Sequence, residues 1–150
     1  MSLLRFDAFL INKYIKIKKD AITAISKNEY FLEFVKRGAY KYYIDLLLLT
    51  IMESNKDYMQ IRYINEHGKE ELRFDRKSHS REVFKTNELQ NKFNRYYFKA
   101  ISKVKKGEVW FSKIDLNIEH GVIEKPNKPV LRVGIPMYLG DKFKGILIIN

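Results

Sequence analysis

Residues 58–75 read YMQIRYINEHGKEELRFD, and their pattern is typical of two paired strands. Apolar and polar side chains alternate over residues 58–64 and again over residues 71–75, the period of a half-buried strand. Residues 65–69 between them are polar, and Gly68 is available for a positive φ. The stretch therefore predicts a β-hairpin.

The residues before the hairpin are predicted to be helical. Residues 3–26 contain no Pro or Gly, and their apolar side chains recur at helical spacing. This apolar stripe is wide enough to pack on a sheet and on a second helix. A second helix is expected from Asn28, a suitable N-cap, to Gly38, and a third over residues 40–53. Residues 1–55 are thus interpreted as an N-terminal helical segment.

The rest of the chain is predicted to complete an antiparallel sheet. Local connections favour an α+β fold, with a five-stranded antiparallel sheet, the long N-terminal helix and flanking helices. Residues 56–150 would form this lobe. The expected order is loop 76–86, helix 88–103 with a break near residues 94–95, strand 108–112, connection 115–128, strand 129–139 and strand 144–150.

The composition indicates one folded domain with a basic surface. Of the 150 residues, 45% are hydrophobic and 14% aromatic, enough to build a core. The net charge is +11, from 29 Lys and Arg against 18 Asp and Glu. Such an excess can bind nucleic acid. The basic residues are scattered along the chain, however, so a solvated surface is favoured and no nucleic-acid partner is predicted.

Several function classes lose support from what the sequence lacks. Cysteine is absent, which excludes disulfides, cysteine catalysis and thiolate metal sites. The longest apolar stretch, residues 44–52, is interrupted by Asp45 and is shorter than the about 20 residues that span a bilayer. No signal peptide is visible at the start of the chain.

No motif indicates an enzyme. His67, His79 and His120 lie in separate segments, and the P-loop, the dinucleotide fingerprint and Gly-x-Ser-x-Gly are missing. Residues 115–126 begin like a calcium loop, but His120 and Pro126 occupy the positions of its Gly and its bidentate Glu. We therefore predict no catalytic residues, no metal and no cofactor.

Arg95 is the residue for which the sequence most strongly suggests a binding role. It lies in residues 92–99, where basic and aromatic side chains interleave, and the aromatic ones are predicted to pack in the core. A guanidinium among aromatic rings needs an anionic partner, because burying it unpaired is costly. That partner is Glu88, Asp115 or the carboxylate of a ligand. The residues alone leave these alternatives open.

Three groups of motifs in residues 57–150 resemble a known family. They are Gln60-Ile61-Arg62-Tyr63-Ile64-x-x-x-Gly68-x-Glu70-x-x-Arg73, then Glu88-Leu89-Gln90-x-Lys92-x-x-Arg95-Tyr96-Tyr97-Phe98, and then the series from Gly107-Glu108-Val109 through Asp115-Leu116-Asn117 to Pro129-Val130-x-Arg132 and Gly145-Ile146. Together they resemble the extracytoplasmic sensor domains of the Cache type, specifically the first lobe of a double-Cache module, which implies that the predicted five-stranded sheet is PAS-like. The resemblance implies a domain outside the cytoplasmic membrane, tethered by membrane helices of a histidine kinase, a diguanylate cyclase or phosphodiesterase, or a chemoreceptor.

The resemblance also implies a ligand site. Residues 95–98 look like the Arg-x-aromatic-aromatic motif with which family members hold a ligand carboxylate. The amino-acid-binding branch has Trp and Tyr where this chain has Tyr97 and Phe98, and an acidic residue where this chain has Asn150. An organic acid is therefore favoured over an amino acid. The expected ligand-binding residues are Arg95, Tyr97, Trp110, Ser112 and Asn150.

The sequence thus predicts a sensor domain that binds a small molecule and forms a homodimer through its N-terminal helix. A basic nucleic-acid-binding module and a ligand-free spacer or dimerisation domain are the alternatives. Asp115, Asn117 and Glu119 are expected to fix the long connection through side-chain to backbone hydrogen bonds.

Overall fold

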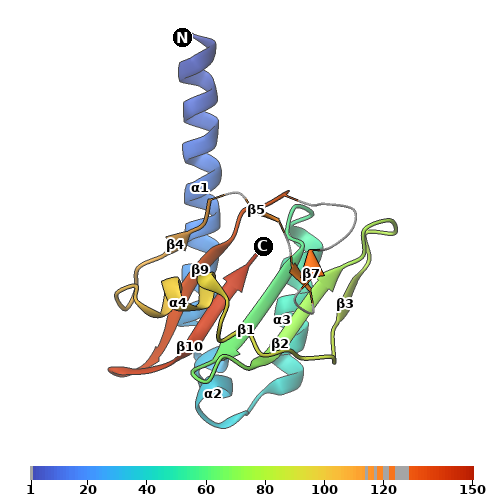
Figure 1. Cartoon of the computed structure of the whole chain (residues 1–150), viewed down its shortest axis with the longest axis vertical. Helices are drawn as coiled ribbons and strands as arrows, with labels where there is room; N and C mark the ends of the chain where they lie inside the picture. The colour runs from blue at the N-terminus through green and yellow to red at the C-terminus, as the bar shows by residue number, and fades with distance from the viewer. Residues whose placement is uncertain (1, 114, 117, 120–121, 124–128) are drawn as a thin grey trace.

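The computed structural model describes residues 2–113, 115–116, 118–119, 122–123 and 129–150. It shows a six-stranded antiparallel sheet with helices on both faces (Figure 1). Helices α1 (Leu3–Lys27), α2 (Glu29–Arg37) and α3 (Lys41–Ser54) cover one face, and α4 (Tyr96–Ser102) lies on the other. The predicted α+β, PAS-like fold class is confirmed, with one strand more than the five expected.

The sheet has the strand order β3-β2-β1-β10-β9-β4. The central strands β1 and β10 pair antiparallel, with Ile61 opposite Ile149, so the predicted hairpin joins the last strand of the chain. Two short ladders lie outside this sheet, one pairing β5 with β8 and the other β6 with β7. The strands are β1 (Gln60–Asn65), β2 (Glu70–Arg76), β3 (Val83–Lys85), β4 (Trp110–Phe111), β5 (Asp115–Leu116), β6 (Ile118–Glu119), β7 (Val122–Ile123), β8 (Pro129–Val130), β9 (Val133–Leu139) and β10 (Lys142–Ile149).

The predicted hairpin and helix ends are confirmed. Strands β1 and β2 pair antiparallel, and Gly68 in their turn has φ +82°. A Cβ there would lie 2.4 Å from the Cβ of Phe93, so the turn requires glycine both for its conformation and for this close approach. Asn28 caps α2 by accepting a hydrogen bond from the Phe31 amide at 3.0 Å, and α2 ends at Gly38 in the left-handed conformation.

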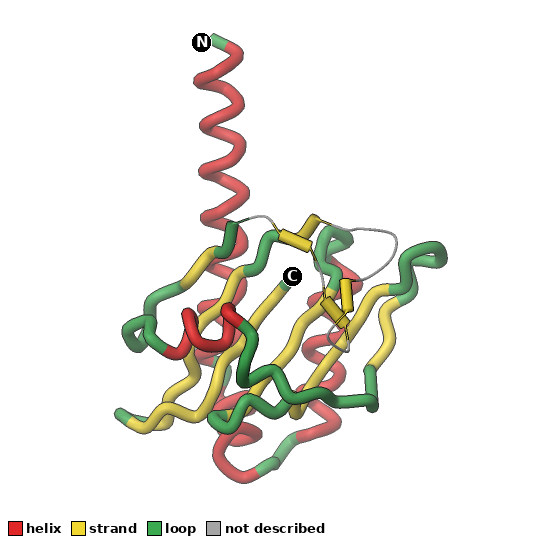
Figure 2. Tube along the Cα trace, viewed as in Figure 1, coloured by secondary structure: helices red, strands yellow, loops and turns green. Residues whose placement is uncertain are grey.

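Three predictions for the second half of the chain are wrong. The expected loop 76–86 contains β3, an edge strand of three residues, too short to show a period. The expected helix 88–103 begins only at residue 96 (Figure 2), because the preceding backbone pairs with the hairpin: the Lys92 amide donates to the Gly68 carbonyl at 2.7 Å. The strand expected over residues 129–139 begins at Val133, since Pro129–Val130 pairs with β5 instead.

The two faces of the sheet differ in chemistry. Along β1, Ile61 and Tyr63 pack into the large apolar core under α1–α3, whereas Ile64 packs with α4 in a smaller cluster. Gly134 on β9 allows α4 to approach closely, since a Cβ there would lie 2.2 Å from Cδ1 of Ile101. Helices and sheet thus share one core, and the division at residue 55 stays a prediction. The expected hydrogen bonds of Asp115, Asn117 and Glu119 concern side chains outside the described part of the chain.

A polar clamp joins α1 to the residues just before β1. The buried Lys18 ammonium donates to the Asp57 carboxylate at 2.8 Å, and the Tyr14 hydroxyl donates to the same oxygen at 2.7 Å. The Lys18 ammonium also lies 4.3 Å from the ring centroid of Tyr58. Two residues after Asp57, the backbone amide of Met59 donates a hydrogen bond to the Asn150 carbonyl at 2.8 Å. This clamp, Tyr14, Lys18, Asp57 and Tyr58, therefore connects the long helix to the end of the central strand pair.

The first half of α1 extends beyond the sheet (Figure 1). Among the described residues, no helix combines the length and the apolar character needed to cross a bilayer. The helix nevertheless exposes a set of large apolar side chains, Leu3, Leu4, Phe6, Phe9, Leu10, Ile11, Tyr14 and Ile17.

The clamp predicts an acid-sensitive contribution to stability. Partial burial raises the pKa of Asp57, but the hydrogen bonds from Lys18 and Tyr14 outweigh it, so the pKa lies below its ordinary value. A lowered folded-state pKa gives stabilisation that is complete above the ordinary Asp pKa, about 3.9, and is lost as the pH falls through the folded value. Thermal melts should therefore show Asp57→Asn less stable than the unchanged chain at pH 6, with the gap closing below about pH 4.

The matched control for this prediction is Asp20→Asn. It removes an exposed carboxylate of α1 that pairs with Lys16 at 2.7 Å, a surface contact that contributes little. A gap between Asp57→Asn and the unchanged chain that stays constant from pH 6 to pH 3 would contradict the prediction.

Candidate functional site

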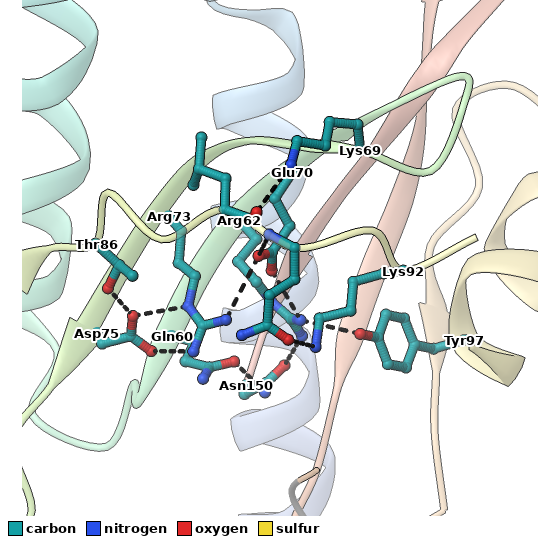
Figure 3. A network of polar contacts seen from close by, with 12 residues as sticks. Gln60, Arg62, Lys69, Glu70, Arg73, Asp75, Thr86, Lys92, Tyr97 and Asn150 are labelled. Atoms are coloured by element: carbon teal, nitrogen blue, oxygen red, sulfur yellow. Dashed lines mark hydrogen bonds and ion pairs between the residues drawn. The ribbon is translucent and has the colours of Figure 1, made fainter. Parts of the chain in front are cut away.

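Polar side chains occupy the α4 side of the central strands, where an open sheet face would carry solvent-exposed residues. They are buried, and α4 and the loop before it lie on this side of the sheet (Figure 3). Strand alternation places them there: Gln60 and Arg62 point away from the apolar core into which Ile61 and Tyr63 point. The group consists of Gln60, Arg62, Glu70, Arg73, Asp75 and Asn150.

Two carboxylates bind two arginines in this group. Glu70 lies between them, 3.4 Å from Nη1 of Arg62 and 3.5 Å from Nη1 of Arg73. Asp75 holds Arg73 in a bidentate contact, at 2.8 Å to Nε and 3.2 Å to Nη2, and accepts a hydrogen bond from the Thr86 hydroxyl. Glu70 also accepts from the Gln90 amide at 2.9 Å, which fixes the loop before α4 to the sheet.

Arg62 connects this ion network to α4 and to the end of β10. Its Nη1 donates to the Tyr97 hydroxyl at 3.0 Å, and its Nη2 donates to Oδ1 of Asn150 at 3.2 Å. Burial lowers the pKa of Arg62, but the charge interactions with Tyr97 and Glu70 outweigh it and raise the pKa above its ordinary value. Asn150 in turn donates to Oε1 of Gln60 at 2.9 Å.

Tyr97 is the centre of a positively charged environment. The guanidinium carbons of Arg62, Arg95 and Arg132 lie 5.1, 5.3 and 5.0 Å from its ring centroid. Burial raises the pKa of the Tyr97 phenol, but the positive charges of Arg62, Lys92 and Arg95 outweigh burial and lower it below its ordinary value. Such an environment stabilises negative charge.

The structure places Arg95 beside Tyr97, as the N-cap residue of α4. Its side chain is half-buried, and its Nε is buried without a hydrogen-bond partner. Arg95 forms no ion pair with Glu88, one of the two protein carboxylates proposed for it, among the described contacts. The other, the Asp115 side chain, lies outside the described part of the chain. A binding role for Arg95 stays a prediction.

The other three residues predicted to bind the ligand, Trp110, Ser112 and Asn150, make different contacts around Tyr97. Asn150 is joined to Tyr97 through Arg62, so these two and Arg95 are brought together. Trp110 packs on Tyr96, with ring centroids 6.2 Å apart. Ser112 accepts a hydrogen bond from the Arg132 amide through its Oγ at 2.8 Å, which fixes the backbone before β9. Its position supports a role in holding Arg132.

Sequence reasoning did not assign Arg62, Arg132 or Lys92 to the site. All three are almost completely buried. The available signal was that Gln60 and Arg62 alternate with apolar residues along β1, a pattern that is equally typical of a solvent-exposed face. Only the position of α4 shows that the face is covered. Among the described residues, no group of three His, Asp or Glu side chains is placed to hold a metal ion.

The ion network predicts a large loss of stability on removing its central charge. Glu70→Gln should lower the free energy of unfolding by about 3 kcal/mol, because it leaves the buried Arg62 and Arg73 short of a counter-charge. Chemical denaturation measures this loss. Glu71→Gln is the matched control: its side chain is exposed, and the change should cost less than about 0.5 kcal/mol. Equal small losses for both variants would show that Glu70 does not compensate the buried arginines.

Solved structures share this fold at low sequence identity. The extracellular domain of a protein assigned as a histidine kinase, vpHK1S-Z8, superposes with a TM-score of 0.88 at 19% identity, over 98% of this chain and 53% of that one. A domain of a protein from Vibrio parahaemolyticus, assigned to the sensory box/GGDEF family, gives a TM-score of 0.91 at 19% identity, over 98% and 56%. The chain spans about half the length of these structures.

A sequence comparison with protein families extends this result beyond the fold. No curated protein gave a significant match. Residues 14–150, however, match the family described as "Bacterial histidine kinase, sensor domain". The match includes the second half of α1, the whole central sheet and α4. The chain belongs to this family of bacterial histidine kinase sensor domains.

Proposed function

We propose that this sensor domain is the extracytoplasmic input domain of a membrane-tethered receptor, and that it binds a small organic acid on the α4 side of its sheet. The observation that carries the ligand proposal is Arg95, whose buried Nε has no partner and whose guanidinium faces the ring of Tyr97. A planar guanidinium suits a carboxylate, which it can hold with two parallel hydrogen bonds.

The proposed location of the domain and the proposed output domain of the receptor are supported by the family and by the similar solved structures. The family consists of histidine kinase sensor domains, and vpHK1S-Z8 was solved as an extracellular domain. A histidine kinase is therefore the proposed output, with a GGDEF protein as the second candidate because of the Vibrio parahaemolyticus neighbour. Sensor domains act by binding and shape change, so no chemistry is assigned to the chain itself.

The basic character of the chain gives little support to nucleic-acid binding. Phosphate contacts need exposed cations, since affinity comes from counterions released at the surface. Among the described residues, six basic side chains are buried within the fold instead: Lys18, Arg62, Arg73, Arg76, Lys92 and Arg132. Arg76, for example, donates to the Tyr58 carbonyl at 3.0 Å and to the Arg81 carbonyl at 2.9 Å.

The same proposal includes a homodimer formed through α1. The exposed apolar side chains of its first half form a larger patch than isolated surface residues would. A second copy of the helix could cover it in a two-fold symmetric contact. Two receptor chains in one membrane are also parallel, which favours side-by-side packing of their long helices.

Carboxylate binding predicts that lysine cannot replace Arg95. In titrations with a panel of small carboxylic acids, Arg95→Lys should lose nearly as much affinity as Arg95→Ala, roughly 10- to 150-fold, because an ammonium cannot reproduce the bidentate contact. Lys99→Ala, which removes an exposed cation of the same helix, should leave affinity within about twofold. If Arg95→Ala lowers only the melting temperature, Arg95 is structural; if no solute binds, the spacer alternative is favoured.

The dimer predicts that acidic residues on α1 weaken self-association. In sedimentation experiments, the pair Ile11→Glu and Ile15→Glu should shift the chain toward monomer while the sheet stays folded, because buried charges without partners oppose the contact. Asn12→Glu adds a charge at a polar, exposed position and serves as the control. A chain that is monomeric at every concentration reached would contradict dimerisation through α1.

A further inference from the structure

We infer that the ligand site is coupled to the N-terminal helix, and that Arg62 is the positioning residue that couples them. The inference rests on the proposed function for the identity of the site, and it adds how binding there is regulated. The coupling route consists of Tyr97, Arg62, Asn150 and residues 57–59, which hold Lys18 of α1. Energetic coupling between separate sites can be carried by such contiguous sets of packed and hydrogen-bonded side chains.

Arg62 bonds the two parts of this route with different nitrogen atoms (Figure 3). Its Nη1 donates to the Tyr97 hydroxyl at 3.0 Å, and its Nη2 donates to Oδ1 of Asn150 at 3.2 Å. Because the guanidinium is planar and rigid, a partner that moves Nη1 also moves Nη2. The side chain is only 2% exposed, so bulk water does not replace a bond that is lost. The positions of Tyr97 and Asn150 therefore depend on each other.

Asn150 links Arg62 to the beginning of β1. Its side-chain amide donates to Oε1 of Gln60 at 2.9 Å, and its backbone amide donates to the Gln60 carbonyl at 2.9 Å. Its carbonyl accepts a hydrogen bond from the Met59 amide at 2.8 Å. A displacement of Asn150 must therefore move residues 59–60 with it or break at least one of these bonds.

The two residues just before Met59 hold α1. Asp57 accepts a hydrogen bond from the Lys18 ammonium at 2.8 Å, and that ammonium lies 4.3 Å from the ring centroid of Tyr58. Lys18 is the first buried residue along α1. Its ion pair therefore fixes the helix next to its exposed half, only two residues from the hydrogen bond between Met59 and Asn150.

Coupling between two sites acts in both directions. A ligand that fixes the Tyr97 ring would also fix Arg62 and Asn150, and would thereby strengthen the contact of Lys18 with the beginning of β1. Conversely, a protein that has lost the Lys18 contact has a less ordered strand end. A ligand must then order these residues as it binds, which weakens its affinity. Binding at the site and the attachment of α1 should therefore stabilise each other.

The first test is a double-variant cycle in thermal melts of the ligand-free protein, at one protein concentration. Lys18→Met removes the ammonium and keeps the apolar stem, and Tyr97→Phe removes only the hydroxyl that Arg62 bonds. The double variant should melt about 2 °C or more above the value obtained by adding the two single shifts, because residues of one network lose part of their interaction together. The matched control replaces Tyr97→Phe by Thr86→Val, which removes a hydroxyl bonded to Asp75 outside the route. In this control the two shifts should add.

The second test measures the coupling from the ligand side, by calorimetric titration with acetate, succinate and citrate. Lys18→Met should weaken binding of the acid that the unchanged protein binds by about threefold or more, although Lys18 does not belong to the proposed site. Lys16→Met is the matched control, because it removes an exposed ammonium of the same helix, one that pairs with Asp20 at 2.7 Å. It should leave the affinity unchanged.

The outcomes separate the inference from the proposed function. Additive melting shifts for Lys18→Met and Tyr97→Phe, or an acid affinity that Lys18→Met leaves unchanged, would overturn the coupling and leave the proposed acid site in place. If none of the three acids binds, the proposed ligand class is lost, and the melting cycle alone decides on the coupling. If Lys18→Met does not fold, Asp57→Asn, which keeps the size of the side chain, replaces it in both tests.

Discussion

The guanidinium of Arg62 is buried on a central strand, and this single charge constrains everything on the α4 side of the sheet. It needs partners on several sides, because an unpaired buried charge costs several kcal/mol. The partners come from β2 (Glu70), from α4 (Tyr97) and from the end of β10 (Asn150). The register of the hairpin, the position of α4 and the end of the last strand are therefore fixed relative to one another by one side chain.

The two faces of the sheet differ in what they bury. The helical side is an apolar core shared by α1–α3 and the sheet, and most of the burial that holds the fold together occurs there. The α4 side has only a small apolar cluster around Ile101, which Gly134 admits by having no side chain. Polar side chains can therefore gather under α4 without weakening the main core, and the proposed ligand site uses this side of the sheet.

The sequence predicted what depends on local pattern and missed what depends on packing. The hairpin, the cap at Asn28 and the end of α2 at Gly38 follow from alternation and backbone chemistry, and all three were predicted. Residues 88–95 look helical in sequence, but their backbone is used to pair with the hairpin turn. Tyr97 was assigned to the site through the motif of residues 95–98. Arg132 belongs to the motifs that carry the family resemblance but was not assigned to the site, because nothing local shows that a basic residue before a strand is buried beside Tyr97.

The contact between Lys18 and Asp57 is also placed like a fulcrum, because it holds α1 to the domain at the base of the projecting part of this helix. Leu3 lies fifteen residues before Lys18, about 22 Å along an α-helix, and the start of this arm projects beyond the sheet (Figure 1). A tilt of about 5° at the fulcrum displaces the start of the arm by about 2 Å. Asp57 lies only three residues from Gln60, whose side chain bonds Asn150. Sub-ångström shifts in the buried network would therefore be amplified where the helix points away from the domain.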